Sequence, residues 1–326
     1  MTARKVIINT DFSTDVGDLG AVALACAAHR IGIFDVLGFV IDSSYTYAPG
    51  ACRATAQYFG LSGQSYGCWK GTPIDETIVS QMWCKSLYDN FPHSGVGLAS
   101  TVDDSTVAYR TMLAAQPNGS VDIVAIGFLN AVSALLDSPG DGISPLTGAQ
   151  LIAAKVRKLF VMGGDYAGGP AEWNFKGGAT PRSDITNATA NICTNWPSPV
   201  RFVGFEAGTF TVGGTFGRNT STDLIANGYS VHGSSSGRTA WDELAMLACL
   251  QDCGDFVQVF GSNSINTTTG ANTWVLNPAG KDAYLSKITS DARLKTRINF
   301  YVGADASASP FFTSWGSEGF LRVEAA

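Results

Sequence analysis

One stretch near the amino terminus constrains the fold more than any other. An apolar, β-branched run, Val6 to Ile8, indicates a buried strand, and the run from Leu19 to Ala28 is long enough for a helix. Three aspartates, Asp11, Asp15 and Asp18, lie between the two runs. Open α/β sheets bind ligands where a strand ends and a helix begins. We therefore expect these carboxylates to lie at a ligand-binding edge of a sheet.

The crowding of the three carboxylates has a chemical consequence. Negative charges this close repel one another unless a cation or a shared proton relieves them. Hard carboxylate oxygens without Cys or His nearby suit Ca²⁺ or Mg²⁺ better than Zn²⁺. A purely structural interpretation is that Asp15 and Asp18 stabilise the amino end of the helix. The clustering of three carboxylates around one turn favours a ligand or metal site.

Strand and helix patterns alternate along the rest of the chain. Strands are expected at 36–41, 121–126, 158–162, 200–203 and 299–302, and helices at 51–59, 105–115, 130–136, 184–193 and 239–250. Continuous apolar strands separated by helices predict an open, mostly parallel α/β sheet with helices on both faces. No linker or repeat divides the chain, so we expect one domain over residues 1–326. The Gly/Ser/Thr-rich stretch 204–237 is expected to flank the site as a loop or lid.

The composition argues against several classes of protein. The chain has 326 residues and a net charge of −6 without a basic cluster, which argues against a nucleic-acid partner. No uncharged apolar run reaches the roughly 18 residues that span a membrane, and no secretion signal precedes the first strand, so a cytoplasmic protein is expected. The seven cysteines are scattered, and Cys249 and Cys253 have no second Cys or His pair with which to bind zinc.

Four further motifs follow expected strands or open an expected helix, so they can converge on the aspartates. They are Ile41-Asp42 with Tyr45, Ile126-Gly127 with Asn130, Met162-Gly163-Gly164 with Glu172-Trp173-Asn174, and Arg238 with Trp241-Asp242. A strand that stops at glycine can direct a backbone carbonyl, here that of Ile126, toward a metal. Carboxylate and amide groups such as those of Glu172 and Asn174 suit sugar hydroxyls. Each motif alone also fits an ordinary turn or surface loop.

Together, the order and spacing of these motifs resemble the inosine–uridine-preferring nucleoside hydrolase family. The family's amino-terminal DTDxGxDVDDxxAL motif is similar to the run from Asn9 to Leu24. Its MGG and Glu-aromatic-Asn elements look like Met162-Gly-Gly and Glu172-Trp-Asn174, its GPLTN turn like Gly127-Phe-Leu-Asn130, and its late HD or SWD motif like Ala240-Trp241-Asp242. The set extends over residues 5–250 and is specific, although no single member is.

The resemblance implies Ca²⁺-dependent hydrolysis of the N-glycosidic bond of a small-molecule nucleoside, as part of nucleoside metabolism. The family's Ca²⁺ holds a water and the ribose 2′- and 3′-hydroxyls. By position, the metal ligands would be the carboxylates of Asp11, Asp18 and Asp242 and the carbonyl of Ile126. Asp11 would also be the general base for the water. Family members are commonly dimers or tetramers, so a homo-oligomer is expected.

The resemblance also assigns the sugar-binding groups, with three departures. Glu172 and Asn174 would hold ribose hydroxyls and stabilise an oxocarbenium-like transition state. Asn9 replaces the first aspartate of the amino-terminal motif, and Trp241 replaces a histidine. Gly17 replaces the first aspartate of the DD pair, so a carboxylate expected at the ribose 2′-hydroxyl is missing. Either Asp15 substitutes for it, or Gly17 leaves room for a 2′-substituted riboside such as a 2′-O-methyl nucleoside.

The replacement of histidine by Trp241 affects the departure of the base. Many family members use that histidine to protonate the leaving base, whereas an indole N–H is a donor only and no general acid. Trp241 is therefore expected to stack on the base and favour its departure. His93 is an alternative acid near the substrate, because histidine is the usual proton donor. His29 and His232 are expected to be structural or solvated.

Two other functions stay open from the sequence. A haloacid-dehalogenase-type phosphohydrolase also places an Asp-rich loop after its first strand, but it needs an aspartate where Asn9 lies. A non-catalytic protein that binds nucleosides or ribosyl groups would fit the departures at Asn9, Gly17 and Trp241. Release of free base, of phosphate, or of neither, with and without a chelator, separates the three functions.

Overall fold

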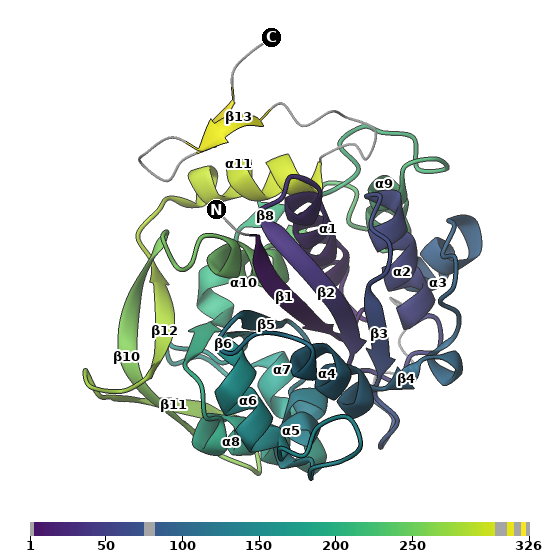
Figure 1. Ribbon diagram of the computed structural model, residues 1–326. Helices are drawn as coiled ribbons and strands as arrows, with labels where there is room; N and C mark the ends of the chain where they lie inside the picture. Colours follow the sequence, from purple (N-terminus) through teal and green to yellow (C-terminus); the bar gives the residue numbers. More distant parts are fainter. Residues whose placement is uncertain (1–2, 75–81, 304–311, 316–320, 324–326) are drawn as a thin grey trace.

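The computed structural model describes residues 3–74 and 82–303, together with the backbone of β13 (Phe312–Trp315) and β14 (Leu321–Val323). Its main sheet has ten strands (Figure 1). They are β1 (Arg4–Thr10), β2 (Phe34–Ile41), β3 (Ser65–Cys68), β4 (Asp103–Asp104), β5 (Val121–Ala125), β6 (Val156–Met162), β7 (Val200–Val203), β10 (Phe256–Ile265), β11 (Asn272–Leu276) and β12 (Asp282–Lys287).

The strand order is β11-β10-β12-β7-β6-β5-β1-β2-β3-β4. All neighbours from β12 to β4 are parallel, and β10 is antiparallel to both β12 and β11. The expected open, mostly parallel α/β sheet is therefore confirmed. Because parallel strands end at one edge, the residues that follow β1, β2, β5 and β6 meet there.

Helices cover both faces of the sheet (Figure 1). They are α1 (Gly17–Arg30), α2 (Ala48–Tyr58), α3 (Met82–Asn90), α4 (Ser105–Ala114), α5 (Asn130–Asp137), α6 (Gly148–Lys155), α7 (Trp173–Lys176), α8 (Ser183–Asn195), α9 (Leu224–Val231), α10 (Trp241–Leu250) and α11 (Asp291–Val302). In the described ranges, each helix is too short or too polar to traverse a lipid bilayer. All seven cysteines are free thiols.

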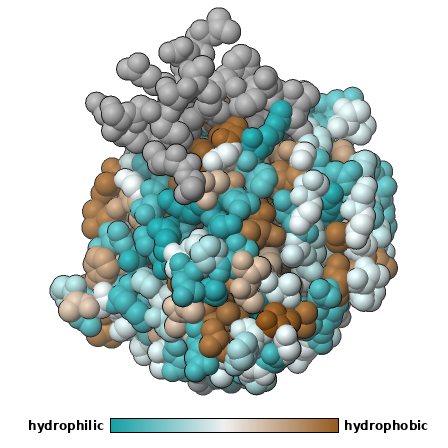
Figure 2. Space-filling model, in the orientation of Figure 1, coloured by the Kyte–Doolittle hydropathy of each residue, from teal (hydrophilic) through white to brown (hydrophobic). Residues whose placement is uncertain are grey.

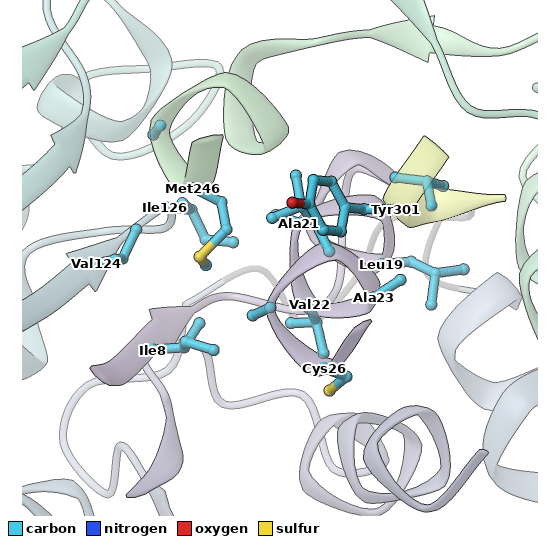
Figure 3. Close-up of a cluster of buried hydrophobic side chains, with 14 of the residues drawn as sticks. Ile8, Leu19, Ala21, Val22, Ala23, Cys26, Val124, Ile126, Met246 and Tyr301 are labelled. Atoms are coloured by element: carbon cyan, nitrogen blue, oxygen red, sulfur yellow. The ribbon is translucent and has the colours of Figure 1, made fainter. Parts of the chain in front are cut away.

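The larger hydrophobic core lies between the sheet and α1, α2, α10 and α11. Figure 3 shows Ile8 of β1, Val22 of α1 and Met246 of α10 in this cluster. Alanine and glycine dominate α1, so α10 can pack closely against it, and every residue from Gly17 to Ala28 is buried. A second core fills the opposite face beneath α4, α5, α6 and α8. The apolar strand patterns are explained by burial on both faces.

The surface in the orientation of Figure 1 is mixed in character. Figure 2 shows hydrophobic residues scattered among hydrophilic ones over this face. Such isolated apolar residues are ordinary for a folded protein and by themselves indicate no binding surface.

One expected element is wrong, and several are missed. Residues 299–302, expected as a strand, form the last turn of α11. The aromatic and β-branched residues there suggested a strand, but Leu294, Ile298 and Tyr301 recur at helical spacing and are buried together. The sequence also missed the antiparallel strands β10 and β11, in which apolar and polar residues are mixed and burial varies from residue to residue.

Candidate active site

A cavity of about 340 Å³ opens at the edge of the sheet where the parallel strands end. We call it the carboxylate cavity. It is lined by Asp11, Thr14, Asp15, Asp18, Ile126, Met162, Glu172, Trp173, Asn174, Phe205, His232, Arg238, Trp241 and Asp242. Asp11 follows β1, Ile126 follows β5, Met162 ends β6, and Asp242 lies in the first turn of α10. Fold topology thus brings together residues that are more than 200 positions apart.

Three buried carboxyl groups, those of Asp11, Asp18 and Asp242, form the floor of this cavity. Burial raises the pKa of both Asp18 and Asp242 well above its ordinary value, and the charges of Asp242 and Asp15 respectively add to the effect. The carboxyl groups of Asp11 and Asp18 are hydrogen-bonded to each other, and the Thr10 hydroxyl donates to Asp18. The floor therefore favours an added positive charge, as a proton or as a cation.

The donors on the floor fit calcium in kind. They are hard oxygens, namely three carboxylates and the carbonyl of Ile126, which Ca²⁺ prefers. The Ile126 carbonyl accepts a hydrogen bond from Asn174 Nδ2 at 3.0 Å. Among the residues that the structure describes, no three Asp, Glu, His or Cys side chains are already arranged to hold a metal. Binding an ion would therefore require the carboxylates to turn.

Asp15, in the loop before α1, and Gly17, the first residue of α1, have different surroundings. Asp15 Oδ1 accepts from the Gly17 backbone N–H at 2.9 Å, and Asp15 Oδ2 accepts from Arg238 Nε and Nη2 at 2.9 and 2.6 Å. Gly17 itself does not line the cavity. A Cβ at Gly17 would lie 2.7 Å from Asp242 Oδ2, so the space beside it holds the Asp242 carboxylate. Gly17 therefore accommodates a floor residue in this structure.

The Glu172 carboxylate has a structural role that the sequence did not reveal. It caps α7 and accepts hydrogen bonds from the backbone N–H groups of Asn174 at 2.9 Å, Phe175 at 3.0 Å and Gly164 at 3.2 Å. Burial raises the pKa of Glu172 to about 7, against the opposing effect of these hydrogen bonds. The capped turn fixes Asn174, whose Nδ2 also donates to the Met162 carbonyl at 3.2 Å. Glu172 thus shapes the loop that presents Asn174.

Aromatic side chains form the mouth of the cavity. Phe205 stacks on Trp241 with ring centroids 5.0 Å apart, and Trp241 Nε1 donates to the Phe205 carbonyl at 3.0 Å. The Arg238 guanidinium lies 5.5 Å from the centroid of the Trp241 ring. Trp173 and Phe205 remain 37% and 39% exposed. The mouth therefore offers a flat apolar surface beside one cation.

His93, the histidine expected near the substrate, and His232, which was not, both lie elsewhere than expected. His93 lies outside the carboxylate cavity, in a shallow hollow formed by residues 88–97, and stacks on Tyr88 at a centroid distance of 4.2 Å. Its Nδ1 lies 2.7 Å from the Val96 carbonyl. The expectation that His93 lies at the substrate is therefore wrong for this cavity. His232, expected to be structural or solvated, lines the cavity at the end of α9 instead.

Asn9 is explained by a buried network beneath the cavity. Its Nδ2 donates to an oxygen of Asp42 and to the Phe128 carbonyl at 3.1 Å, and its Oδ1 accepts from the Tyr109 hydroxyl at 2.9 Å. Asp42 follows β2 and is fully buried. An amide at position 9 can donate to this neighbouring carboxylate, whereas a second carboxylate there would repel it.

Sequence reasoning missed Phe205 and His232 as lining residues, and it named Arg238 in the motif with Trp241 and Asp242 without giving it a role. The signal that pointed toward them was general: the Gly/Ser/Thr-rich stretch 204–237 was expected to flank the site. Phe205 and His232 lie within this stretch, and Arg238 follows it directly. No periodic pattern singles out the three residues, because they come from short turns and the two-residue strand β9 (Arg238–Thr239), which pairs with β8 (Thr211–Val212).

Comparisons by sequence and by structure with known proteins give different results. No protein-family model and no curated protein matches the sequence. Among solved structures, the inosine–uridine-preferring nucleoside hydrolase of Bacillus anthracis has 15% identity and a TM-score of 0.65, covering 92% of this chain and 99% of that one. The purine-preferring ribonucleoside hydrolase from Gardnerella vaginalis has 13% identity and a TM-score of 0.67, with 93% and 99% covered.

A third similar structure carries a different description. The type III effector protein XopQ, complexed with adenosine diphosphate ribose, has 12% identity and a TM-score of 0.62, with 93% of each chain covered. At these identities the likeness concerns the backbone arrangement alone. It extends over more than nine-tenths of the chain, so the protein has the fold of the nucleoside hydrolases.

Proposed function

We propose that the protein is a Ca²⁺-dependent nucleoside hydrolase, which cleaves the N-glycosidic bond of a ribonucleoside to give free base and ribose. The observation that carries this proposal is one cavity that joins a carboxylate floor, an amide at Asn174 and an aromatic mouth. Two of the structures with the same fold are described as nucleoside hydrolases, which supports the same reaction here.

The floor residues have two roles in the proposed hydrolysis: they would hold the ion, and one of them accepts the proton of the attacking water. A calcium ion bound there would supply a positioned, polarised water and an anchor for the ribose hydroxyls. Asp11, buried beside Asp18, takes the proton from the water that attacks the anomeric carbon. As the C–N bond breaks, the sugar ring acquires positive charge, and the negative floor stabilises that charge. No Ser or Cys nucleophile is required for this reaction.

Asn174 is the polar group best placed to bind the sugar. Its side-chain amide lies between the ends of β5 and β6, within hydrogen-bond distance of the carbonyls of Ile126 and Met162. An amide both donates and accepts, as a hydroxyl does. Glu172 holds Asn174 in place through the turn that it caps, and we propose positioning as its main contribution.

The mouth suits an aromatic leaving base. Trp173 and Phe205 expose ring surface, and Phe205 is stacked on Trp241. A purine or other aromatic base gains from stacking on such a surface, and departs from the sugar while remaining in contact with it. We therefore place the base in the mouth and the ribose over the floor.

Position 17, where a carboxylate toward the sugar 2′-hydroxyl was expected, carries none. Gly17 has no side chain, and Asp15 is held by two nitrogens of Arg238. We propose that the enzyme accepts 2′-substituted ribosides, such as 2′-O-methyl nucleosides, alongside plain ones. Because Asp242 occupies the space beside Gly17, this tolerance requires that carboxylate to turn away.

A nucleoside panel tests the proposal. Inosine, adenosine, uridine and 2′-O-methylinosine are incubated with the protein in Ca²⁺ or in a chelator, and free base is separated by chromatography. We expect base release in Ca²⁺ and its loss in the chelator, with 2′-O-methylinosine within about tenfold of inosine, the size of one missing hydrogen bond. No base release from any nucleoside contradicts the proposal. Light scattering of the same sample tests the proposed homo-oligomer.

A ribosyl-binding protein without turnover is the second candidate. Within the described residues, no ready-made group of metal-binding side chains is present, and XopQ is described in complex with adenosine diphosphate ribose. Calorimetric titration with adenosine diphosphate ribose, in parallel with the nucleoside panel, separates the candidates. Heat of binding without base release favours this candidate, and release of phosphate from phosphorylated substrates favours a phosphohydrolase.

A further inference from the structure

We propose that Arg238 activates the leaving base: its guanidinium stabilises the negative charge that develops on the base as the C–N bond breaks. This inference rests on the proposed function. It assigns the stabilisation of the leaving base, which the carboxylates of the floor cannot provide. It identifies Arg238 as a catalytic residue that contacts the base in the mouth of the carboxylate cavity.

Among the described residues that line the mouth, none is a poised proton donor. The one N–H of Trp241 donates to the Phe205 carbonyl at 3.0 Å. His232 Nδ1 lies 2.9 Å from Ser234 Oγ, and the ring is also hydrogen-bonded to the backbone of Thr14. Burial lowers the pKa of His232, despite the charge of Asp15, and Arg238 lowers it further. A neutral, doubly hydrogen-bonded imidazole is a poor acid, so the departing base needs another form of stabilisation.

Arg238 has the position and the charge for this task. Of the described residues that line the cavity, it is the only lysine or arginine. Its guanidinium lies 5.5 Å from the centroid of the Trp241 ring, and Phe205, stacked on Trp241, exposes the ring surface on which we place the base. Asp15 raises the pKa of Arg238 further, so the guanidinium keeps its charge at any working pH.

The ion pair with Asp15 orients the guanidinium and leaves part of it available. Asp15 engages Nε and Nη2, and no residue in the described part of the chain accepts a hydrogen bond from Nη1. The backbone of Arg238 is fixed by the pairing of β9 with β8, opposite Val212. A donor held in advance at the place where charge develops stabilises a transition state without reorganisation.

The reaction balances without a proton from Arg238. The water oxygen forms a bond to the anomeric carbon, and the C–N bond breaks with its electron pair going to the base nitrogen. The proton of the water goes to Asp11. The departing base interacts with the guanidinium and takes its own proton from solvent, so Arg238 ends each turnover unchanged.

The test compares two leaving groups in the Ca²⁺-loaded protein. Nitrophenolate is a weak base that departs unaided, whereas a purine anion needs stabilisation. In Arg238→Gln, we expect kcat for inosine to fall about 100-fold, the scale of one preorganised donor, and kcat for 4-nitrophenyl riboside to stay within about threefold. Arg238→Lys, which keeps the charge without the planar fork, is expected to recover part of the inosine activity.

Two further variants separate catalysis from structure. Asp15→Asn removes the anchor of Arg238 and is expected to lower activity on both substrates, because the loop of Asp11 is disturbed as well. Arg182→Gln is a matched control: Arg182 pairs with Asp184 through Nε and Nη2 at 3.3 and 2.8 Å, and it does not line the cavity. It is expected to leave both activities unchanged.

The outcomes are distinct. Equal losses on inosine and nitrophenyl riboside in Arg238→Gln, or no loss on inosine, overturn the role of Arg238 while leaving the proposed function intact. A wild-type protein that is inert toward both ribosides, with and without Ca²⁺, overturns the proposed function and this inference together.

Discussion

The floor and the mouth of the carboxylate cavity are built in different ways. The floor comes from the ends of β1 and β5 and the first turns of α1 and α10, all packed into the larger core. Apart from Trp173 of α7, the mouth comes from residues 204–241, where short turns, the β8–β9 pair and α9 lie between β7 and α10. The floor residues lie in or directly adjoin the strands and helices of the main sheet, whereas most of the mouth is formed by a long connection between β7 and α10.

This difference assigns separate tasks to the two regions. The floor holds buried carboxyl groups in a rigid frame, which suits the attack of water. The mouth holds aromatic rings and one cation, which suit recognition and departure of the base. Contacts between the regions include the ion pair of Asp15 with Arg238 and the hydrogen bond of His232 to Thr14. Changes in the floor should therefore affect all substrates, and changes in the mouth should depend on the base.

The largest effect is expected in the floor, from Asp11→Asn. The amide cannot take the proton of the attacking water, so kcat should fall about 1,000-fold for inosine and for nitrophenyl riboside alike. Steady-state kinetics with both substrates measures this. Asp35→Asn serves as a control, because Asp35 pairs with Lys5 at 3.2 Å on the surface. A loss confined to inosine would mean that Asp11 acts on the departure of the base. It would then contradict the separate tasks assigned to the floor and the mouth.

An effect on stability is expected from the carboxyl groups around the floor. Burial raises the pKa of Glu172 to about 7 and that of Glu243, whose Oε1 accepts from the Tyr229 hydroxyl at 3.0 Å, to about 8. The folded state therefore binds more protons than the unfolded state between about pH 4.5 and these values, so stability falls as pH rises through this window. We expect the chelated protein to be less stable at pH 8 than at pH 5, by on the order of 5 kcal/mol from these two groups together.

Thermal unfolding at the two pH values, in a chelator and in Ca²⁺, measures this effect. Ca²⁺ should restore more stability at pH 8, where the carboxyl groups need a counter-charge most. Glu243→Gln isolates one group, since the amide does not titrate, and it should flatten the pH dependence in the chelator. A chelated wild-type protein that is more stable at pH 8 than at pH 5 would contradict the proposed balance of charge.

The floor was easier to predict from the sequence than the mouth. Strands β1, β2, β5, β6 and β7, and the position of Asp11 after β1, followed from local patterns, because an apolar run followed by polar residues defines a strand end. Asp242 was expected at the same edge from the motif that opens the helix 239–250. The pairing of Asp15 with Arg238 joins residues 223 positions apart and depends on the path of the whole 204–241 segment. Likewise, Glu172 was assigned to the sugar because its capping of α7 is visible only in three dimensions.

The smallest effect is expected in the mouth, from Phe205→Ala. The substitution removes one stacking ring and leaves the floor unchanged, so KM for inosine should rise about fivefold with little change in kcat, as one aromatic contact is worth about 1 kcal/mol. Phe300→Ala is a matched control, because Phe300 on α11 is 38% exposed, against 39% for Phe205, and does not line the cavity. If kcat falls while KM is constant, the ring acts in the departure of the base instead of in its binding, and the division between floor and mouth must be redrawn with Phe205 beside Arg238.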